Sequence, residues 1–277
     1  MPDTNLPNPS AIEPSATTQS PSQGSSTSFS AQASEKNRVH IVLQGKGGVG
    51  KSLIAFLIAQ YLVEKNKPVT CIDADPINAT LCETEALQAK AVRILEPGTE
   101  NVCPHALDDI TKMVLEADGN VVLDSGATSF APLSRYLLQD GIIDAIYESG
   151  KGLVIHTVVA GGPELLQTGR AFDSIATQFP ANVGIVLWLN EHHGPVVGAD
   201  GGDFEDTVIF KRHAKRIMGL IKLRKLDPFF GKSFAAMREQ RLTFAQATST
   251  EGGLFVLDRS RLSRLRFHLW SQIEQVL

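Results

Sequence analysis

The sequence predicts an α/β protein with a doubly wound, mostly parallel sheet covered by helices on both faces. Short apolar runs of strand length alternate with longer segments of helical periodicity, and glycine-rich or acidic turns follow several of the apolar runs. The composition is that of a globular chain, since 43% of the residues are hydrophobic and 20% are charged. No apolar run is long enough to indicate a membrane span.

The first 36 residues differ from the rest in composition. Ser, Thr, Pro, Gln and Ala dominate residues 1–36, so we predict a disordered tail that cannot bury enough apolar surface to fold. Residues 37–277 are predicted to form one domain, because no repeat or linker interrupts them. The chain lacks a signal-peptide pattern, and its three cysteines fit neither a disulfide scaffold nor a zinc site. We therefore expect a cytoplasmic protein.

Each predicted element follows from a run of one periodicity. Strands are expected at 39–43, 69–72, 121–123, 153–159 and 183–189, and within 216–223. Helices are expected at 52–64, 104–117, 131–148 and 163–178, and near 232–240 and 259–276. The last helix is amphipathic, and we expect it to pack on the sheet rather than lie on a membrane.

A glycine-rich loop follows the first predicted strand. Gly45-Lys46-Gly47-Gly48-Val49-Gly50-Lys51-Ser52 fits the phosphate-binding pattern G-x-x-x-x-G-K-[ST]. Glycines let backbone N–H groups turn toward phosphates, and the helix that follows adds its positive N-terminal end. Lys51 is predicted to reach the β- and γ-phosphates, and Ser52 to ligate Mg²⁺. A glycine-rich turn without a ligand is the alternative.

Carboxylates follow two other predicted strands. Asp124 ends the run 121–123 and is predicted to hold the metal through water, while Gly126 offers an N–H group to the γ-phosphate. Asp73 is predicted to join the outer shell of the metal, and Asp75 to orient the attacking water. The alternatives are an ordinary strand-ending turn at Asp124 and a helix cap at Asp75, with Pro76 as the first helical residue.

These motifs resemble those of a known family. The segment from Lys46 to Ser52 resembles the deviant Walker A motif, KGGxxGK[ST], of the ParA/MinD-type P-loop ATPases. "DADP" resembles their switch I, and "VVLDSGAT" resembles their Walker B and switch II. The similarity spans roughly residues 39–277. The strings "VLQGKGGVGKS", "CIDADPINATL", "DSGATSFAPLS" and "VIHTVVAGG" are similar to conjugal transfer proteins of plasmids.

The resemblance implies a function as well as a fold. ATP and Mg²⁺ would be the cofactors, with Lys46, Lys51 and Asp75 as catalytic residues and Asn190 near the base. Lys46 would reach across a homodimer to the nucleotide of the other subunit. The protein would be a slow ATPase that acts as a dimerising switch in conjugal transfer or in positioning DNA or a protein complex. The alternative is a small-molecule phosphotransferase or synthetase, whose dimer would not depend on ATP.

The resemblance implies that the densest basic cluster could contact DNA phosphates non-specifically, since relatives in that family bind DNA through basic patches. Proteins of a conjugation complex are the other candidate partners. The alternative is a solvated surface balanced by the acidic residues at 200–206. The cluster contains Lys211, Arg212, Lys215, Arg216, Lys222, Arg224 and Lys225.

Overall fold

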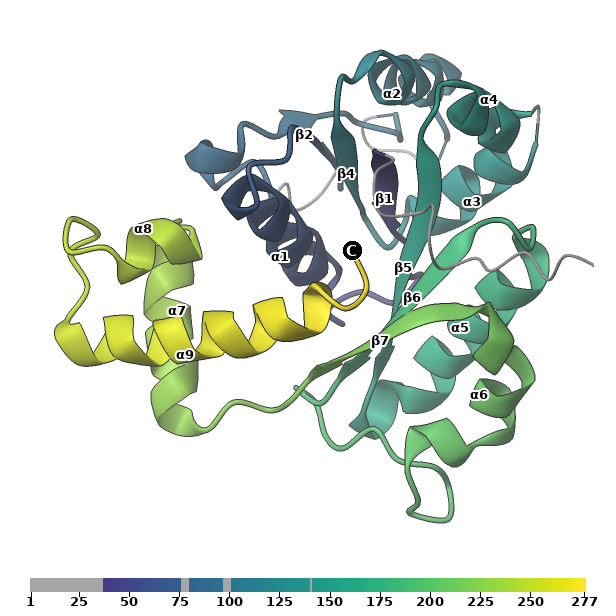
Figure 1. The fold of residues 1–277 in the computed structure, drawn as a ribbon. Coiled ribbons are helices and arrows are strands. Elements are labelled where there is room, and N and C mark those ends of the chain that lie inside the picture. The colour runs from purple at the N-terminus through teal and green to yellow at the C-terminus, as the bar shows by residue number, and fades with distance from the viewer. Residues whose placement is uncertain (1–36, 76–79, 97–100, 140) are drawn as a thin grey trace, which may run out of the picture. The chain divides into compact units, whose positions relative to one another are not determined.

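The computed structural model describes residues 37–75, 80–96, 101–139 and 141–277. The predicted tail at 1–36 and the predicted helix start at Pro76 lie outside the described residues. In this described part of the chain, seven strands form one sheet in the order β3-β2-β4-β1-β5-β6-β7, and neighbouring strands are parallel throughout (Figure 1). The predicted doubly wound parallel sheet is therefore confirmed.

The elements have the following bounds. The strands are β1 Arg38–Val42, β2 Val69–Ala74, β3 Lys90–Ala91, β4 Asn120–Ser125, β5 Gly152–Ala160, β6 Gly184–Asn190 and β7 Ile217–Leu223. The helices are α1 Lys51–Glu64, α2 Pro104–Glu116, α3 Phe130–Leu138, α4 Ile142–Glu148, α5 Leu165–Gln178, α6 Val208–His213, α7 Pro228–Glu239, α8 Phe244–Thr248 and α9 Val256–Ile273. Short 3₁₀ turns lie at Glu85–Leu87, Gly162–Glu164, Phe204–Asp206 and Ala214–Arg216.

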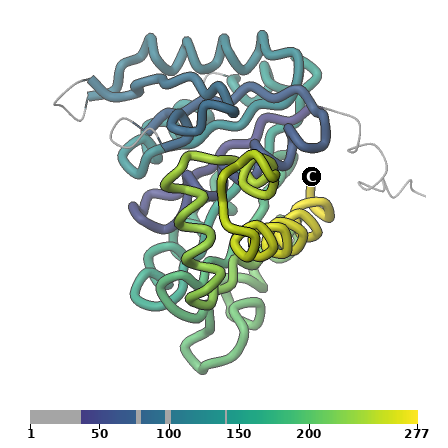
Figure 2. The backbone as a smooth tube through the Cα atoms, turned by 90° about the vertical axis from the view of Figure 1, so that its left-hand side faces the viewer, coloured from purple at the N-terminus to yellow at the C-terminus, as the bar shows by residue number. Residues whose placement is uncertain are grey.

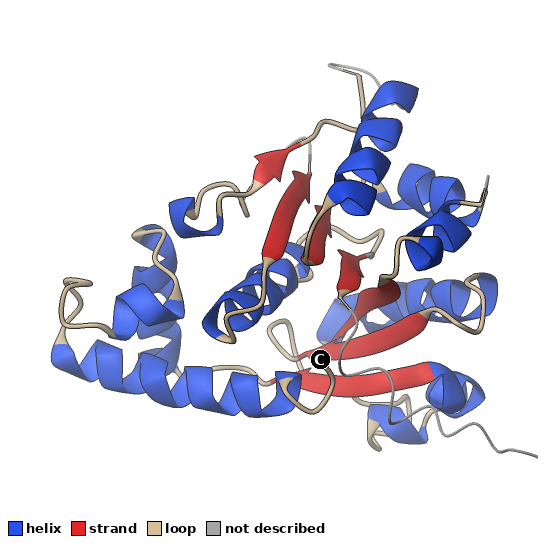
Figure 3. Ribbon diagram, turned by 45° about the horizontal axis from the view of Figure 1, so that its top comes forward, coloured by secondary structure: helices blue, strands red, loops and turns tan. Residues whose placement is uncertain are grey.

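Each face of the sheet packs against its own set of helices. Side chains alternate along a strand, so Val122, Val154 and Val186 face α1 and α7–α9, while their neighbours in sequence face α2–α6. Figure 3 shows the strands as a layer between the helices, and Figure 2 shows α7, α8 and α9 grouped together. The amphipathic α9 packs as predicted, with Leu262 and Ile273 buried against this core.

Some element predictions were wrong. The single helix expected at 131–148 is two helices, α3 and α4. The backbone at Gln139 is extended and Gly141 has a φ of 71°, and neither conformation can continue a helix from α3 into α4. The sequence analysis also missed β3, which has only two residues, and the short helices α6 and α8.

The topology places the functional motifs together. The central strand β1 pairs with β4 on one side and β5 on the other, so the order of the strands reverses there. Asp124 is in register with Val42, where β1 ends, and with Asp73 in β2. The glycine-rich loop and both carboxylates therefore lie at the same edge of the sheet. None of the described helices is long and apolar enough to cross a membrane.

Candidate functional site

The loop between β1 and α1 is built to approach an anion closely. Gly48 and Gly50 have φ angles of 73° and 99°, in the left-handed region that favours glycine. A Cβ atom on Gly50 would lie 2.9 Å from Asn190 Nδ2, so a side chain there would displace Asn190 as well as strain the backbone. Helix α1 begins directly afterwards at Lys51, and Gly50 has no side chain to cap its first N–H groups. This end of α1 is therefore open to a phosphate.

Lys51 is the cation of this loop. Its side chain is buried, and its Nζ donates a hydrogen bond to the carbonyl oxygen of Lys46 at 2.9 Å. Burial lowers the pKa of Lys51, and the carboxylates of Asp124 and Asp75 oppose that shift. A phosphate in the loop would replace a neutral carbonyl with a charged partner for this ammonium group.

Asp124 is the least satisfied polar group of the site. It is fully buried, and apart from the neighbouring Ser52 hydroxyl no described residue offers its carboxylate oxygens a hydrogen bond. Burial raises the pKa of Asp124 to about 7, against the opposing effects of the Ser52 hydroxyl and Lys51. A buried carboxylate with so few donors suits a divalent cation. Ser52 and Asp124 therefore fit the predicted Mg²⁺ site.

Asp73 has a visible structural role. One carboxylate oxygen accepts the N–H groups of Leu81 at 2.9 Å and Cys82 at 3.2 Å, and the other accepts that of Asp75 at 3.2 Å. It thereby fixes the chain on both sides of residues 76–79. Burial raises the pKa of Asp73, and these donors oppose the rise. Its predicted place in the metal's outer shell stays a prediction. Asp75 lines the same cavity as Lys51 and Ser52.

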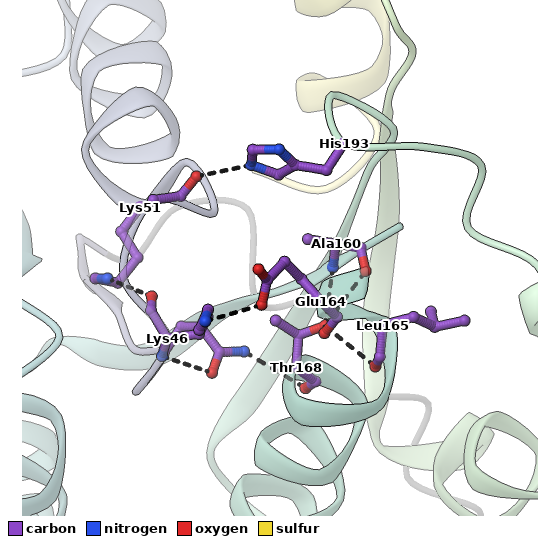
Figure 4. Close-up of polar contacts among 9 residues, drawn as sticks. Lys46, Lys51, Ala160, Glu164, Leu165, Thr168 and His193 are labelled. Atoms are coloured by element: carbon purple, nitrogen blue, oxygen red, sulfur yellow. Dashed lines mark hydrogen bonds and ion pairs between the residues drawn. The ribbon is translucent and has the colours of Figure 1, made fainter. Parts of the chain in front are cut away.

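Lys46 is engaged within its own chain, as Figure 4 shows. Its Nζ lies 3.1 Å from Glu164 Oε2, and the two side chains are 32% and 24% exposed. Glu164 ends the 3₁₀ turn before α5, where the Thr168 hydroxyl donates to its carbonyl oxygen at 2.7 Å. Buried Gln44 lies beneath the loop, donating to Val158 O at 2.7 Å and accepting from Lys46 N at 3.4 Å.

Asn190 holds the loop from the β6 side. Its Nδ2 donates to Val49 O at 3.0 Å, and its Oδ1 accepts from His192 N at 3.1 Å. His193 Nε2 lies 3.1 Å from Gly48 O. A mainly apolar cavity of about 550 Å³ opens beside these residues, and its lining includes Leu53, Leu57, Phe234 and Leu265. It is large enough for a planar base next to the loop. The other predicted loop residues follow β1 and Gly126 follows β4, so they lie at the sheet edge that carries Asp124.

Ion pairs already neutralise part of the predicted basic cluster. Lys211 pairs with Asp206, Arg212 with Asp173 and Lys222 with Glu205. Arg216 donates to the carbonyl oxygens of Ala176, Phe179 and Pro180, at the end of α5. Lys215, Arg224 and Lys225 are exposed. The acidic residues near 200–206 thus balance some of the charge, as the alternative interpretation expected.

The sequence analysis missed Gln44, Glu164 and His193. Gln44 precedes the glycine-rich loop and Glu164 ends a turn, yet nothing in the sequence around them indicates a contact with Lys46. Their signal is only positional, because each follows the end of a strand at the edge where ligands gather.

Comparison with known proteins agrees with this site. Residues 40–228 match the family described as CobQ/CobB/MinD/ParA nucleotide binding domain. Two proteins named TraL from Escherichia coli are 39% and 37% identical to this chain over 238 residues. Each alignment covers 86% of this chain and 97% of the relative. The predicted resemblance to the ParA/MinD-type family and to TraL is confirmed.

Solved structures with similar chains include two MinD proteins. The MinC:MinD cell division complex of Aquifex aeolicus has a TM-score of 0.45 and 14% identity, and covers 82% of this chain and 95% of that chain. The septum site-determining protein MinD of Pyrococcus horikoshii, complexed with Mg-ADP, has a TM-score of 0.41 and 13% identity, with the same coverage.

Proposed function

The chain belongs to the CobQ/CobB/MinD/ParA family of nucleotide-binding domains, and from that premise we propose that it is a slow, Mg²⁺-dependent ATPase that acts as a dimerising switch. The observation that carries this proposal is Asp124. It is a buried carboxylate with almost no hydrogen-bond donors around it, and it is in register with the end of β1, from which the glycine loop leads to buried Lys51. A metal–triphosphate complex supplies both the cation and the anion that these groups lack.

Each side chain then has a defined task. Lys51 and the loop N–H groups hold the phosphates, while Ser52 and Asp124 hold Mg²⁺. Bound Mg²⁺ neutralises charge on the β- and γ-phosphate oxygens. Asp75 orients the water whose oxygen attacks the γ-phosphorus while the bond to the β–γ bridging oxygen breaks and ADP leaves. The Asp73 carboxylate keeps Asp75 in place by accepting its backbone N–H group at 3.2 Å. The base occupies the apolar cavity beside Asn190.

The dimer proposal rests on Lys46. Lys51 and the loop amides are sufficient to bind the phosphates of their own subunit. Lys46 therefore has a role if it contacts a nucleotide bound to another subunit. Its present partner is Glu164. We propose that Lys46 exchanges Glu164 for the phosphates of the second subunit when two chains enclose ATP, and that hydrolysis reverses this exchange.

The cellular role follows from similarity to TraL. We propose a part in plasmid conjugal transfer, with proteins of a conjugation complex as partners, in the reducing cytoplasm. All three cysteines are free, which agrees with that compartment. A phosphotransferase or synthetase remains the alternative, and it would pass phosphate to a metabolite without ATP-dependent dimerisation.

The phosphate-loop assignment is tested by Lys51→Ala. A desolvated triphosphate would lose its main cationic partner, so we expect MgATP affinity to fall by at least about tenfold. Isothermal titration calorimetry measures this directly. Lys67→Ala, at an exposed position after the end of α1, is the control and should bind as the wild type does. Unchanged affinity of Lys51→Ala would reject the assignment.

DNA contact is a second partner proposal, which rests on exposed Lys215, Arg224 and Lys225. If they meet phosphates, exchanging Lys215 and Lys225 for Glu should weaken binding to random duplex DNA and reduce its salt dependence. Fluorescence anisotropy over a salt series would measure both effects, with Lys112→Glu on α2 as the control. If the wild type with ATP does not bind DNA even at low salt, DNA is not a partner.

A further inference from the structure

Helix α7 brings an arginine to the nucleotide cavity. Arg238 lies in the last turn of α7, and its side chain helps line a cavity of about 480 Å³. The same cavity is lined by Lys51, Ser52 and Asp75, together with glycines of the loop. In Figure 1, α7 belongs to the helices that follow β7, far along the chain from every motif of the site.

The guanidinium group of Arg238 is held in place by a buried ring. Its Cζ atom lies 4.1 Å from the centre of the Phe56 ring. Phe56 is 1% exposed and lies on α1, one turn after Ser52. Stacking on a fixed aromatic face orients the planar group and reduces the entropy that it loses on binding a ligand. The group is therefore preorganised at the wall of the cavity.

The guanidinium group of Arg238 is not paired directly with a carboxylate in the described parts of the chain, although Glu83 acts on it electrostatically. No hydrogen bond or ion pair joins it to a described residue, and its ring contact is with Phe56. Burial lowers the pKa of Arg238, and the more distant carboxylate of Glu83 opposes this effect. A partly buried cation without an acceptor is unfavourable unless a ligand provides one. The adjoining cavity is the place where an anion would do so.

We propose that Arg238 is a further ligand-binding residue, and that its guanidinium binds the phosphate chain of the nucleotide. This inference rests on the proposed function, because it takes a nucleoside triphosphate as the ligand of the cavity. The planar fork can donate two parallel N–H groups to phosphate oxygens. The competing explanation is that the arginine stem only packs on Phe56, which would not require its charge.

Two substitutions separate charge from packing. Arg238→Met keeps an unbranched stem against Phe56 and removes the charge, whereas Arg238→Lys keeps the charge. We expect Met to weaken the affinity for both MgADP and a non-hydrolysable MgATP analogue by at least about tenfold. Lys should lose less than Met, because it keeps the charge but not the planar fork. Equilibrium titration with fluorescent nucleotides measures both. Lys232→Met, at an exposed position on the same helix, should bind as the wild type does.

Several results would overturn the inference. Arg238→Gln is measured beside Arg238→Met in case the Met variant is too unstable to assay, and thermal denaturation shows which variants are folded. Wild-type affinity in a folded Met or Gln variant would show that the charge is not used. Equal losses in the Lys and Met variants would indicate a role in shape alone. A wild-type chain that binds no nucleotide would instead reject the proposed function, and this inference with it.

Discussion

At the scale of single residues, the contact between Lys46 and Glu164 is the one that dimerisation would have to change. A partly exposed ion pair of this kind is worth up to about 1 kcal/mol, which corresponds to about a fivefold change in an equilibrium. Glu164→Gln removes the charge that holds Lys46 in its own subunit. We expect this variant to dimerise at ATP concentrations up to about fivefold lower, as measured by analytical ultracentrifugation with Asp75→Ala in the background to block turnover.

Glu148→Gln, at an exposed position of α4, is the matched control and should leave dimerisation unchanged. Weaker dimerisation of Glu164→Gln would have a different meaning. It would indicate that Glu164 positions Lys46 for the second subunit instead of retaining it.

Individual site residues were predictable where one local motif defines them. The loop 45–52 and Asp124 follow strands whose apolar runs are plain in the sequence, and the parallel register then brings them together. Glu164 and Arg238 were not predictable, because their roles depend on which distant residue each one meets. A salt bridge to Lys46 and a stacking contact on Phe56 are products of tertiary packing.

At the scale of secondary-structure elements, a buried polar chain joins three strands beneath α1. Trp188 Nε1 donates to His156 Nδ1 at 3.0 Å, so the proton of neutral His156 lies on Nε2. His156 Nε2 then donates to His40 Nδ1, which is also 3.0 Å away. Burial lowers the pKa of His40 to about 3, with smaller effects from Arg38 and Lys67. Burial also lowers the pKa of His156, reinforced by His40 and Arg38. Both rings are therefore neutral in the folded chain.

The hydrogen-bonded row of Trp188, His156 and His40 predicts a loss of stability in weak acid. The unfolded histidines bind protons below about pH 6.5, whereas the folded ones do not, so their contribution is complete above that pH. It should decline as the pH falls from about 6.5 toward 3, by about 1.4 kcal/mol per pH unit for one histidine. His40→Asn removes one titrating ring and keeps an acceptor for His156. Urea unfolding between pH 7 and 5.5 should show a smaller slope, and the difference should approach that amount only at the acid end of the range, where the unfolded ring is mostly protonated.

The control for this experiment is His105→Asn, at an exposed position of α2, which should keep the wild-type slope. An equal slope in His40→Asn and the wild type would show that His40 is protonated in the folded chain.

Elements were predictable in proportion to their length and periodicity. The long buried strands and α1 were found because each carries an uninterrupted apolar pattern. The break between α3 and α4 was missed because apolar spacing continues across it, although Gly141 is a stop signal. Helix α8 carries a recognisable capping box, Thr243 with Gln246, which the sequence analysis did not use.

At the scale of the whole molecule, the site is open on the side where Lys46 and Glu164 meet. Lys51, the other charged residue of the loop, is buried, whereas both members of this pair are partly exposed. A second subunit could reach Lys46 without rearrangement of the sheet. The full site would then consist of the phosphate grip and Asp75 of one subunit and Lys46 of the other.

A mixing experiment tests this composite site. Lys46→Ala and Asp75→Ala should each bind ATP and hydrolyse it poorly, since the first lacks the residue given in trans and the second lacks the residue that orients water. In a mixed dimer, one site receives its Asp75 from the Lys46→Ala chain and its Lys46 from the Asp75→Ala chain, so it is intact. The other site carries both lesions. We therefore expect the mixture to recover ATPase activity approaching half that of the wild type per mixed dimer, as measured by phosphate release. Without recovery in a mixture shown to dimerise, and with the wild type active as a monomer, Lys46 would act within its own subunit.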